Sequence, residues 1–182
     1  VFGKWSSRGK IKAVEESQSA NQFEMVMDTL TESGYQHYEI SNFCLPGFAS
    51  IHNSSYWQQK KYLGVGPSAH SFDGETRQFN VSNNYLYLNS MREGKISFEK
   101  EILSRENKIN EYIFTSLRTD RGCNLSYLIN THHYDLGKIN SDYLQSLLNE
   151  GYVTLIHDIL LLTKKGKLLA DKIAADLFAT LE

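Results

Sequence analysis

Residues 37–80 read HYEISNFCLPGFASIHNSSYWQQKKYLGVGPSAHSFDGETRQFN, and this stretch joins two parts of the chain that have different patterns. Before it, residues 18–33 carry apolar side chains at helical spacing, which predicts a helix behind the capping candidates Ser17 and Ser19. Residues 37–43 then alternate between apolar and polar side chains and predict a strand. A helix followed by a strand is half of a βαβ unit, so this part is expected to be of the α/β type.

The rest of the stretch predicts a loop-rich binding segment. Residues 42–79 hold both prolines of the chain and four glycines, together with many aromatic and polar side chains. Loops of this composition on a rigid scaffold are where binding groups tend to lie. Beyond them, Ser82 is the expected cap of a helix that ends near Gly94, and residues 1–16 are expected to form an incoming loop.

From about residue 103 the pattern changes to short amphipathic helices. Three apolar stripes predict three of them. The stripes are Ile109, Tyr112, Ile113 and Leu117, then Leu125 and Leu128, then Leu144, Leu147 and Leu148. Residues 152–156 and 159–162 predict a β-hairpin around His157 and Asp158, and Thr163 is expected to cap a closing helix.

Three helices, a hairpin and a closing helix together predict a winged-helix-like domain. A chain of 182 residues has room for roughly one to one and a half domains. The pattern changes near residues 95–105, so we expect one domain over residues 1–97, with the binding segment, and a helical domain over residues 98–182. The expected fold class is α+β.

Charge and composition exclude several classes of function. Nineteen basic and 21 acidic residues give a net charge of -2, which does not favour nucleic acid as a partner. Residues 140–150, the helix that a winged-helix protein would place on DNA, hold no Lys or Arg. No run approaches the ~18 apolar residues of a membrane span. The two isolated cysteines, Cys44 and Cys123, favour a reducing, cytoplasmic compartment and cannot supply an iron–sulfur cluster.

The motif HNxxYW is the densest group of candidate binding residues. It consists of His52, Asn53, Tyr56 and Trp57. An imidazole can ligate haem iron while aromatic rings pack against the macrocycle, which makes haem a candidate ligand. Taken alone, these residues favour the simpler interpretation of an aromatic core cluster around a hydrogen-bonded histidine.

The segment YLGVGPSAHS, residues 62–71, is a second candidate. Its glycines allow a ligand close to the backbone, and its small side chains leave room for a nucleotide-like molecule. It differs from the pattern GxGxxG, because Pro67 lacks an amide donor and no third glycine follows. From spacing alone, a tight turn after a buried strand is the simpler interpretation.

These motifs resemble those of the radical S-adenosylmethionine family that contains oxygen-independent coproporphyrinogen III oxidase and the HemW-type haem chaperones. The resemblance rests on YEISNF, HNxxYW and YLGVGPSAHS, and on LTxxGK at residues 162–167. It implies a partial (β/α) barrel that binds S-adenosylmethionine and a [4Fe–4S] cluster, followed by an appended domain. The CxxxCxxC motif of the cluster is absent, so the chain resembles a C-terminal fragment that begins at the end of the barrel and is inactive in radical chemistry by itself.

Within that family, HNxxYW marks the HemW-type branch. The resemblance implies that His52 is an axial haem ligand and that the rest of the motif completes the haem site. It also implies that the cofactor S-adenosylmethionine contacts four residues, namely Gly66, Ser68, Ala69 and His70. The oxidase carries an apolar residue where this chain has His70, which distinguishes it from the oxidase.

Three functions follow as hypotheses. The first is a fragment of a HemW-like haem chaperone, with a tetrapyrrole and haem-accepting proteins as partners. The second is a fragment of a coproporphyrinogen oxidase, which decarboxylates two propionates in haem synthesis. The third is a winged-helix module that binds a protein. A homodimer formed through the strand edge at residues 37–43 is a further expectation.

Overall fold

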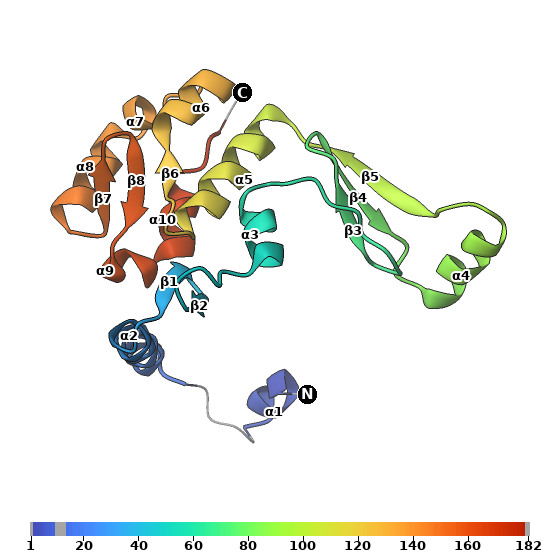
Figure 1. The fold of residues 1–182 in the computed structure, drawn as a ribbon, viewed down its shortest axis with the longest axis horizontal. Coiled ribbons are helices and arrows are strands. Elements are labelled where there is room, and N and C mark those ends of the chain that lie inside the picture. Colours follow the sequence, from blue (N-terminus) through green and yellow to red (C-terminus); the bar gives the residue numbers. More distant parts are fainter. Residues whose placement is uncertain (1, 10–13, 181–182) are drawn as a thin grey trace. The chain divides into compact units, whose positions relative to one another are not determined.

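The computed structural model describes residues 2–9 and 14–180, and the chain divides into two compact units, residues 1–49 and 50–182. Helices and short strands are mixed in both units, so the fold is α+β, as the sequence predicts (Figure 1). Every strand pairing in the described part of the chain is antiparallel, whereas half of a βαβ unit implies a parallel strand.

The first unit consists of two helices and a short hairpin. Its elements are α1 (Phe2–Ser7), α2 (Glu16–Glu32), β1 (Gln36–Glu39) and β2 (Asn42–Cys44). The prediction of a loop over residues 1–16 is wrong at α1. Gly3 lies within the first turn of this helix, and Gly9, at φ 66°, follows its end, so neither glycine interrupts it. Residues 10–13, on which part of the loop prediction falls, lie outside the described residues.

Helix α2 confirms the predicted helix but begins earlier than the capping serines imply. Glu15 occupies the N-cap and makes no side-chain hydrogen bond there, so Ser17 and Ser19 lie inside the helix. Met27, from the predicted apolar stripe, is the buried residue of α2. The serines are therefore ordinary helix positions, and the cap prediction is wrong.

The predicted single strand over residues 37–43 is also wrong, because the chain reverses within it. Strands β1 and β2 pair with each other in an antiparallel hairpin. The carboxylate of Glu39 accepts hydrogen bonds from the backbone N–H of Ser41, at 2.9 Å, and from the side-chain amide of Asn42. Glu39 is buried. The alternation of apolar and polar residues places it on the polar face of a strand, whereas in the structure its carboxylate stabilises the turn.

The first half of the second unit is a short helix followed by a three-stranded sheet. Its elements are α3 (Ile51–Trp57), β3 (His70–Phe72), β4 (Thr76–Asn80), α4 (Asn84–Arg92) and β5 (Phe98–Ile102). The strand order is β3-β4-β5, and α4 connects β4 to β5 at one end of the sheet (Figure 1). Arg77 lies in the central strand, opposite Phe72 on one side and Glu101 on the other.

A helix and a hairpin therefore occupy the segment that the sequence predicts to be loop. The hydroxyl of Ser50 accepts a hydrogen bond from the backbone N–H of Asn53 at 3.2 Å and caps α3. The turn between β3 and β4 has Gly74, at φ 96°, as its first central residue, which is typical of tight hairpins. The cap residue Ser50 and the β3–β4 turn are each local features of a few residues. The prolines and glycines of residues 42–79 predict a loop and hide these features in the sequence.

Helix α4 is where the sequence predicts a helix, but its cap is Asn83 and not Ser82. The Asn83 side chain accepts hydrogen bonds from the N–H groups of Tyr85 and Leu86, at 3.0 and 3.1 Å. Strand β5 begins at residue 98, next to the expected domain boundary, and pairs along its whole length with β4. The division at residues 97 and 98 stays a prediction.

The second half of this unit is helical and contains a small sheet. Its elements are α5 (Arg105–Leu117), β6 (Cys123–Asn124), α6 (Leu125–His132), α7 (Leu136–Ile139), α8 (Ser141–Asn149), β7 (Val153–Ile156), β8 (Ile159–Leu162), α9 (Lys164–Lys167) and α10 (Ala170–Asp176). The strand order is β6-β8-β7. Ile156 and Ile159 close the β7–β8 hairpin, which confirms the predicted turn. The closing helix is split into α9 and α10, because Leu169 leaves the helical region at φ −117° and ψ 20°.

Helix α5 contributes a central stripe of the core. Ile109 and Ile113 are fully buried and Leu117 is nearly so, which confirms the predicted stripe. Fully or almost fully buried side chains from the neighbouring elements are Leu128, Leu136, Leu160, Ile173 and Leu177. This packing anchors α5, and α5 in turn supplies one wall of the site described below.

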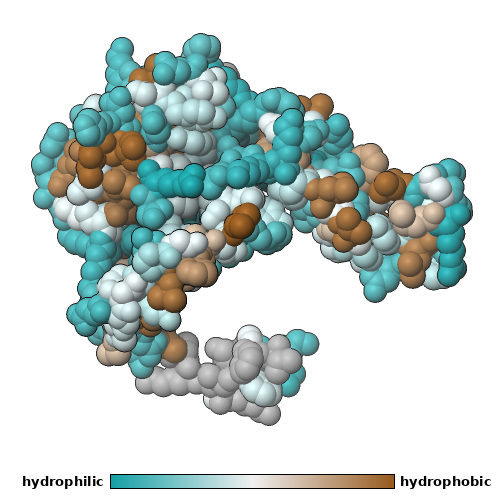
Figure 2. Space-filling view, viewed as in Figure 1, coloured by the Kyte–Doolittle hydropathy of each residue, from teal (hydrophilic) through white to brown (hydrophobic). Residues whose placement is uncertain are grey.

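The surface of the sheet end is less well packed. Helix α4 has no buried residue, and its side chains Tyr85, Leu88 and Met91 are exposed. Figure 2 shows hydrophobic surface, in brown, at this end of the second unit. Over the described ranges, 2–9 and 14–180, no helix combines the length and the apolar character that a membrane span requires.

Candidate functional site

The four residues of HNxxYW lie on α3 but on two sides of it. His52 and Tyr56 are one turn apart and in edge-to-face ring contact, with centroids 5.0 Å apart. Both are exposed, Tyr56 at 41%. Asn53 and Trp57 are likewise one turn apart, and both are half-buried. The structure thus separates the motif into an exposed imidazole–phenol pair and a half-buried amide–indole pair.

A series of ring contacts connects His52 with Phe72, which is buried. Tyr56 contacts Tyr62 with centroids 4.8 Å apart, and Tyr62 lies 6.1 Å from Phe72. Backbone hydrogen bonds in both directions between Tyr62 and Phe72 fix the segment after α3 against β3. The motif on α3 is therefore connected through packed rings to the three-stranded sheet.

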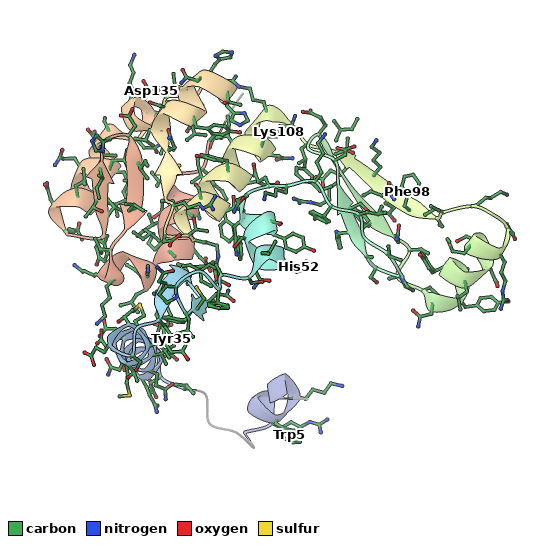
Figure 3. All side chains as sticks on the ribbon, in the orientation of Figure 1. Trp5, Tyr35, His52, Phe98, Lys108 and Asp135 are labelled. Carbon is green, nitrogen blue, oxygen red and sulfur yellow. The ribbon has the colours of Figure 1, made fainter. Side chains whose placement is uncertain are left out.

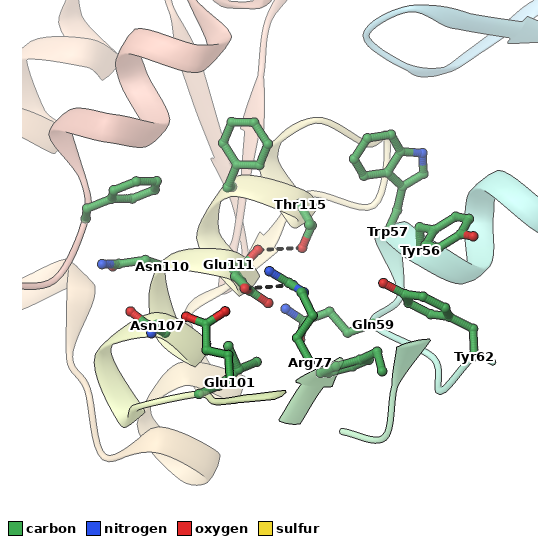
Figure 4. A pocket seen from close by; sticks show the side chains of 14 residues that line it. Tyr56, Trp57, Gln59, Tyr62, Arg77, Glu101, Asn107, Asn110, Glu111 and Thr115 are labelled. Carbon is green, nitrogen blue, oxygen red and sulfur yellow. Dashed lines mark hydrogen bonds and ion pairs between the residues drawn. The ribbon is translucent and has the colours of Figure 1, made fainter. Parts of the chain in front are cut away.

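These rings reach a pocket of about 620 Å³ between α3, the sheet and α5 (Figure 4). Its volume falls within the roughly 300–1,000 Å³ of small-molecule sites. The aromatic residues of its wall are Tyr56, Trp57, Tyr62, Phe72, Phe114 and Phe178. His52 is not part of this lining, although its ring contacts that of Tyr56.

Few charged groups face this pocket. Arg77 on β4 forms an ion pair of 2.8 Å with Glu111 on α5 across it (Figure 4). Glu101 also lines the pocket and has no ion-pair partner in the described part of the chain. The Arg77–Glu111 pair ties the sheet to the helical half, so the pocket depends on the two halves of the unit staying together.

Arg118 packs against Trp57, which lines the pocket. The guanidinium carbon of Arg118 lies 5.4 Å from the ring centroids of both Trp57 and Phe114. Asp171 accepts a hydrogen bond from Arg118 at 2.7 Å and fixes its orientation. The indole N–H of Trp57 is buried and has no hydrogen-bond partner among the described residues. Trp57 therefore contributes a packed aromatic ring to the wall of the pocket.

A second pocket, of about 420 Å³, opens beside the first. The basic side chains that line it are Arg105, Lys108, His132 and His133. Lys108 pairs with the carboxylate of Glu75. Burial lowers the pKa of His132, and the charges of Lys108 and Arg105 lower it further. The positive charges of α5 thus converge at the end of α6.

The residues expected to contact S-adenosylmethionine lie around the start of β3. Gly66, at φ 109°, and Ser68, at φ 59°, form a tight turn in which the N–H of Ala69 donates to the carbonyl of Gly66 at 3.3 Å. Ser68 and His70 line a third pocket of about 360 Å³, whereas Gly66 and Ala69 do not. The His70 ring lies 5.6 Å from that of Phe79.

The glycine turn has a steric requirement of its own. A Cβ atom on Gly64 would lie 2.1 Å from the carbonyl oxygen of His70, so this position has no room for a side chain. The side chain of Asn80 donates a hydrogen bond to the carbonyl of Gly66 at 3.0 Å and stabilises this turn. The tight-turn interpretation is thus sufficient for the glycines, and contact with a cofactor stays a prediction.

The chain does not fit an iron–sulfur cluster. It has two cysteines in all, and a cluster is held by several thiolates. Cys44 and Cys123 are both buried, and burial raises the pKa of the Cys123 thiol to about 11, which keeps it protonated. Among the described residues, no group of three or more His, Cys, Asp or Glu side chains could hold a metal ion.

Three pocket residues, Glu101, Glu111 and Phe178, have no signal in the sequence. They come from β5, α5 and the C-terminal tail, and only in the folded unit do they meet Arg77 of β4, which is part of the resemblance over residues 37–80. The motif HNxxYW contains Tyr56 and Trp57, which line the pocket, but also His52, which lies outside it. No local spacing relates residue 57 to residue 178.

Comparisons with known proteins match the two kinds of protein that the motifs resemble. The haem chaperone HemW of Lactococcus lactis is 33% identical over 150 residues, which are 82% of this chain and 39% of that protein. The haem chaperone HemW of Bacillus subtilis is 29% identical over 174 residues, which are 95% of this chain and 46% of that protein. No family model matches the chain.

Among solved structures, coproporphyrinogen III oxidase (HemN) from Escherichia coli, a radical SAM enzyme, covers 100% of this chain with a TM-score of 0.67. The sequence identity is 20%, so the likeness shows a shared fold, and the match covers 46% of the oxidase chain. This chain thus spans less than half the length of the relatives that it matches.

Proposed function

Because this chain is a distant homologue of part of the haem chaperones HemW, we propose that it is the C-terminal part of a haem-trafficking protein. One observation carries the proposal. His52 is exposed on α3 beside Tyr56, with their rings 5.0 Å apart, so an iron ligand and an aromatic packing surface lie together. An imidazole that is open to solvent can ligate haem iron without a rearrangement of the core.

In this proposal the remaining motif residues have supporting roles. Tyr56 packs against the macrocycle, Asn53 lies one position after the ligand, and Trp57 fixes α3 against the helical half through its contact with Arg118. Haem is cargo here, and haem-accepting proteins are the proposed partners. The two isolated cysteines support a reducing, cytoplasmic compartment.

The test is a haemin titration of the whole chain and of His52→Ala, followed by the Soret band. The matched control is His157→Asn, which removes a second exposed histidine in a turn with φ 54° that asparagine tolerates. We expect His52→Ala to weaken binding tenfold or more, which corresponds to about 1.4 kcal/mol. Binding that is unchanged in His52→Ala, or equally weakened in His157→Asn, would contradict the proposal.

The domains and the cofactor loop complete the proposal. We infer that residues 1–97 correspond to the end of a radical SAM barrel and residues 98–182 to the appended winged-helix-like domain, which the order α5, α6, α8 and the β7–β8 hairpin supports. S-adenosylmethionine supplies radical chemistry when it is bound to a cluster, and this chain would contribute the Gly66–His70 loop to its pocket. Calorimetric titration of S-adenosylmethionine into the chain and its His70→Ala variant tests that contribution.

The homodimer is the least supported part of the proposal. The edge that would pair is not a seven-residue strand but the short strands β1 and β2, which already pair with each other. Light scattering at high protein concentration tests it, and a monomeric mass would remove the dimer from the proposal. The chaperone role does not depend on that result.

A further inference from the structure

The first and second pockets of the second unit adjoin each other. Gln59, Phe72, Leu103 and Glu111 line both of them. The first pocket has six aromatic side chains in its wall, and the second is lined by four basic side chains together with the carboxylates of Glu75 and Glu111. A compartment with aromatic walls therefore lies beside one that contains Arg105.

Arg105 is the cation best placed to receive a ligand's negative charge. Its Nε and Nη2 atoms donate to the carbonyls of His132 and His133 at 2.8 and 3.0 Å, which fixes the guanidinium at the end of α6. A guanidinium has five N–H donors, so several stay free for another acceptor. In the described part of the chain no carboxylate forms an ion pair with Arg105, whereas Arg77 and Lys108 are paired with Glu111 and Glu75.

Lys108 adds to this charge from the next turn of α5, where Figure 3 labels it. Burial is the main cause of the lowered pKa of His132, and the nearby charges of Lys108 and Arg105 lower it further. His52, also labelled in Figure 3, lies on α3, on a separate element from this basic group.

We propose that the two adjoining pockets bind a flat macrocycle with carboxylate side arms, the ring against the aromatic walls and a carboxylate on Arg105. This inference rests on the proposed function, which makes a tetrapyrrole the ligand, and it adds a place for the ring that needs no iron. Arginine binds carboxylates through parallel N–H donors, and aromatic walls favour a planar ring. Glu75 and Glu111 also line the second pocket, but they are paired with Lys108 and Arg77, whereas Glu101 in the first pocket has no ion-pair partner among the described residues. A ligand carboxylate therefore belongs at Arg105.

Metal-free protoporphyrin IX is the probe that separates this site from iron ligation by His52. The chain has two tryptophans, Trp5 and Trp57, so a Trp5→Phe background leaves Trp57, in the pocket wall, as the reporter. We expect saturable quenching of Trp57 fluorescence by the porphyrin. His52→Ala should leave this quenching unchanged, because no metal is present.

Arg105→Gln tests the carboxylate contact and keeps a side-chain donor for the α6 carbonyls. We expect it to weaken binding of protoporphyrin IX at least fivefold and to leave binding of its dimethyl ester unchanged. Lys100→Gln on β5 is the charge-matched control, because Lys100 lines neither pocket. Phe178→Ala is the second variant, since this exposed tail residue can change without unfolding the core, and it should weaken both ligands.

Each result decides one question. An absence of quenching, or equal effects of Arg105→Gln on the acid and the ester, overturns the proposed site. Haemin binding that depends on His52, found together with no binding of the metal-free ring, leaves the chaperone role standing and removes this pocket. Porphyrin binding that depends on Arg105, found with haemin binding indifferent to His52, supports the pocket and contradicts the axial ligand.

Discussion

Asn110 and Ala179, 69 positions apart, exchange two hydrogen bonds. The N–H of Ala179 donates to Asn110 Oδ1 at 2.6 Å, and Asn110 Nδ2 donates to the carbonyl of Ala179 at 3.1 Å. The side chain of Asn110 thereby pairs with the C-terminal tail much as a neighbouring strand would. The preceding residue, Phe178, is held in the wall of the aromatic pocket.

Replacement of Asn110 by alanine should release this tail. The backbone groups of Ala179, which is buried, would lose both partners, so we expect the free energy of unfolding to fall by about 1–3 kcal/mol. Urea denaturation measures this change. Asn107→Ala, on the same helix and lining the same pocket, is the control, and it should have a smaller effect. Equal losses in the two variants would mean that the tail contact contributes nothing specific.

Gly166 and Gly137 should respond in opposite directions to alanine. A Cβ on Gly166 would lie 1.9 Å from the carbonyl oxygen of Tyr152, so backbone must move, and we expect a destabilisation of about 1–3 kcal/mol. Around Gly137 the nearest atom to such a Cβ is 3.6 Å away, and the helix propensity of alanine should stabilise α7 by up to about 1 kcal/mol. Thermal unfolding compares the two, and equal shifts of Tm would contradict the difference in space.

The Cys123 thiol should make the stability of the fold depend on alkaline pH. Burial raises its pKa from 9.0 to about 11, so between these values the folded state keeps a proton that the unfolded state loses. This contribution is fully present below pH 9 and is lost as the pH rises through 11, by an amount on the order of 2–3 kcal/mol. Urea denaturation at several pH values should show a shallower decline for Cys123→Ala. The same slope in both proteins would assign the decline to other groups.

Asp73 should titrate far below an ordinary aspartate. The N–H of Glu75, the Thr76 hydroxyl and the Thr76 N–H all donate to its carboxylate, and they lower its pKa from 3.8 to about 2. Its contribution to the β3–β4 turn is present above pH 3.8 and is lost as the pH falls through 2. Carboxyl chemical shifts in NMR should give a midpoint near 2 for Asp73, and a midpoint near 3.8 would show that this turn is not formed in solution.

The sequence is informative where one element carries its own signal. The stripe Ile109, Ile113 and Leu117 predicts α5, and the β-rich runs around His157 and Asp158 predict the β7–β8 hairpin, because burial on one face leaves a regular period. The sequence does not predict short elements that are fixed by single side-chain hydrogen bonds. Glu39 at the β1–β2 turn and Ser50 at the start of α3 are examples, because one polar side chain produces no periodic pattern in the sequence.

For the site, the sequence by itself determined the chemistry that α3 carries, an imidazole beside aromatic rings, and the resemblance to haem chaperones that this motif supports. Only the tertiary structure decided that Tyr56 and Trp57 face a pocket that His52 does not line, and that Arg105, which has no carboxylate partner among the described residues, lines the adjoining pocket. The physical reason is that periodicity shows which face of an element is buried but not what it is buried against. A wall made from α3, the sheet, α5 and Phe178 exists only after residues more than a hundred positions apart have packed together.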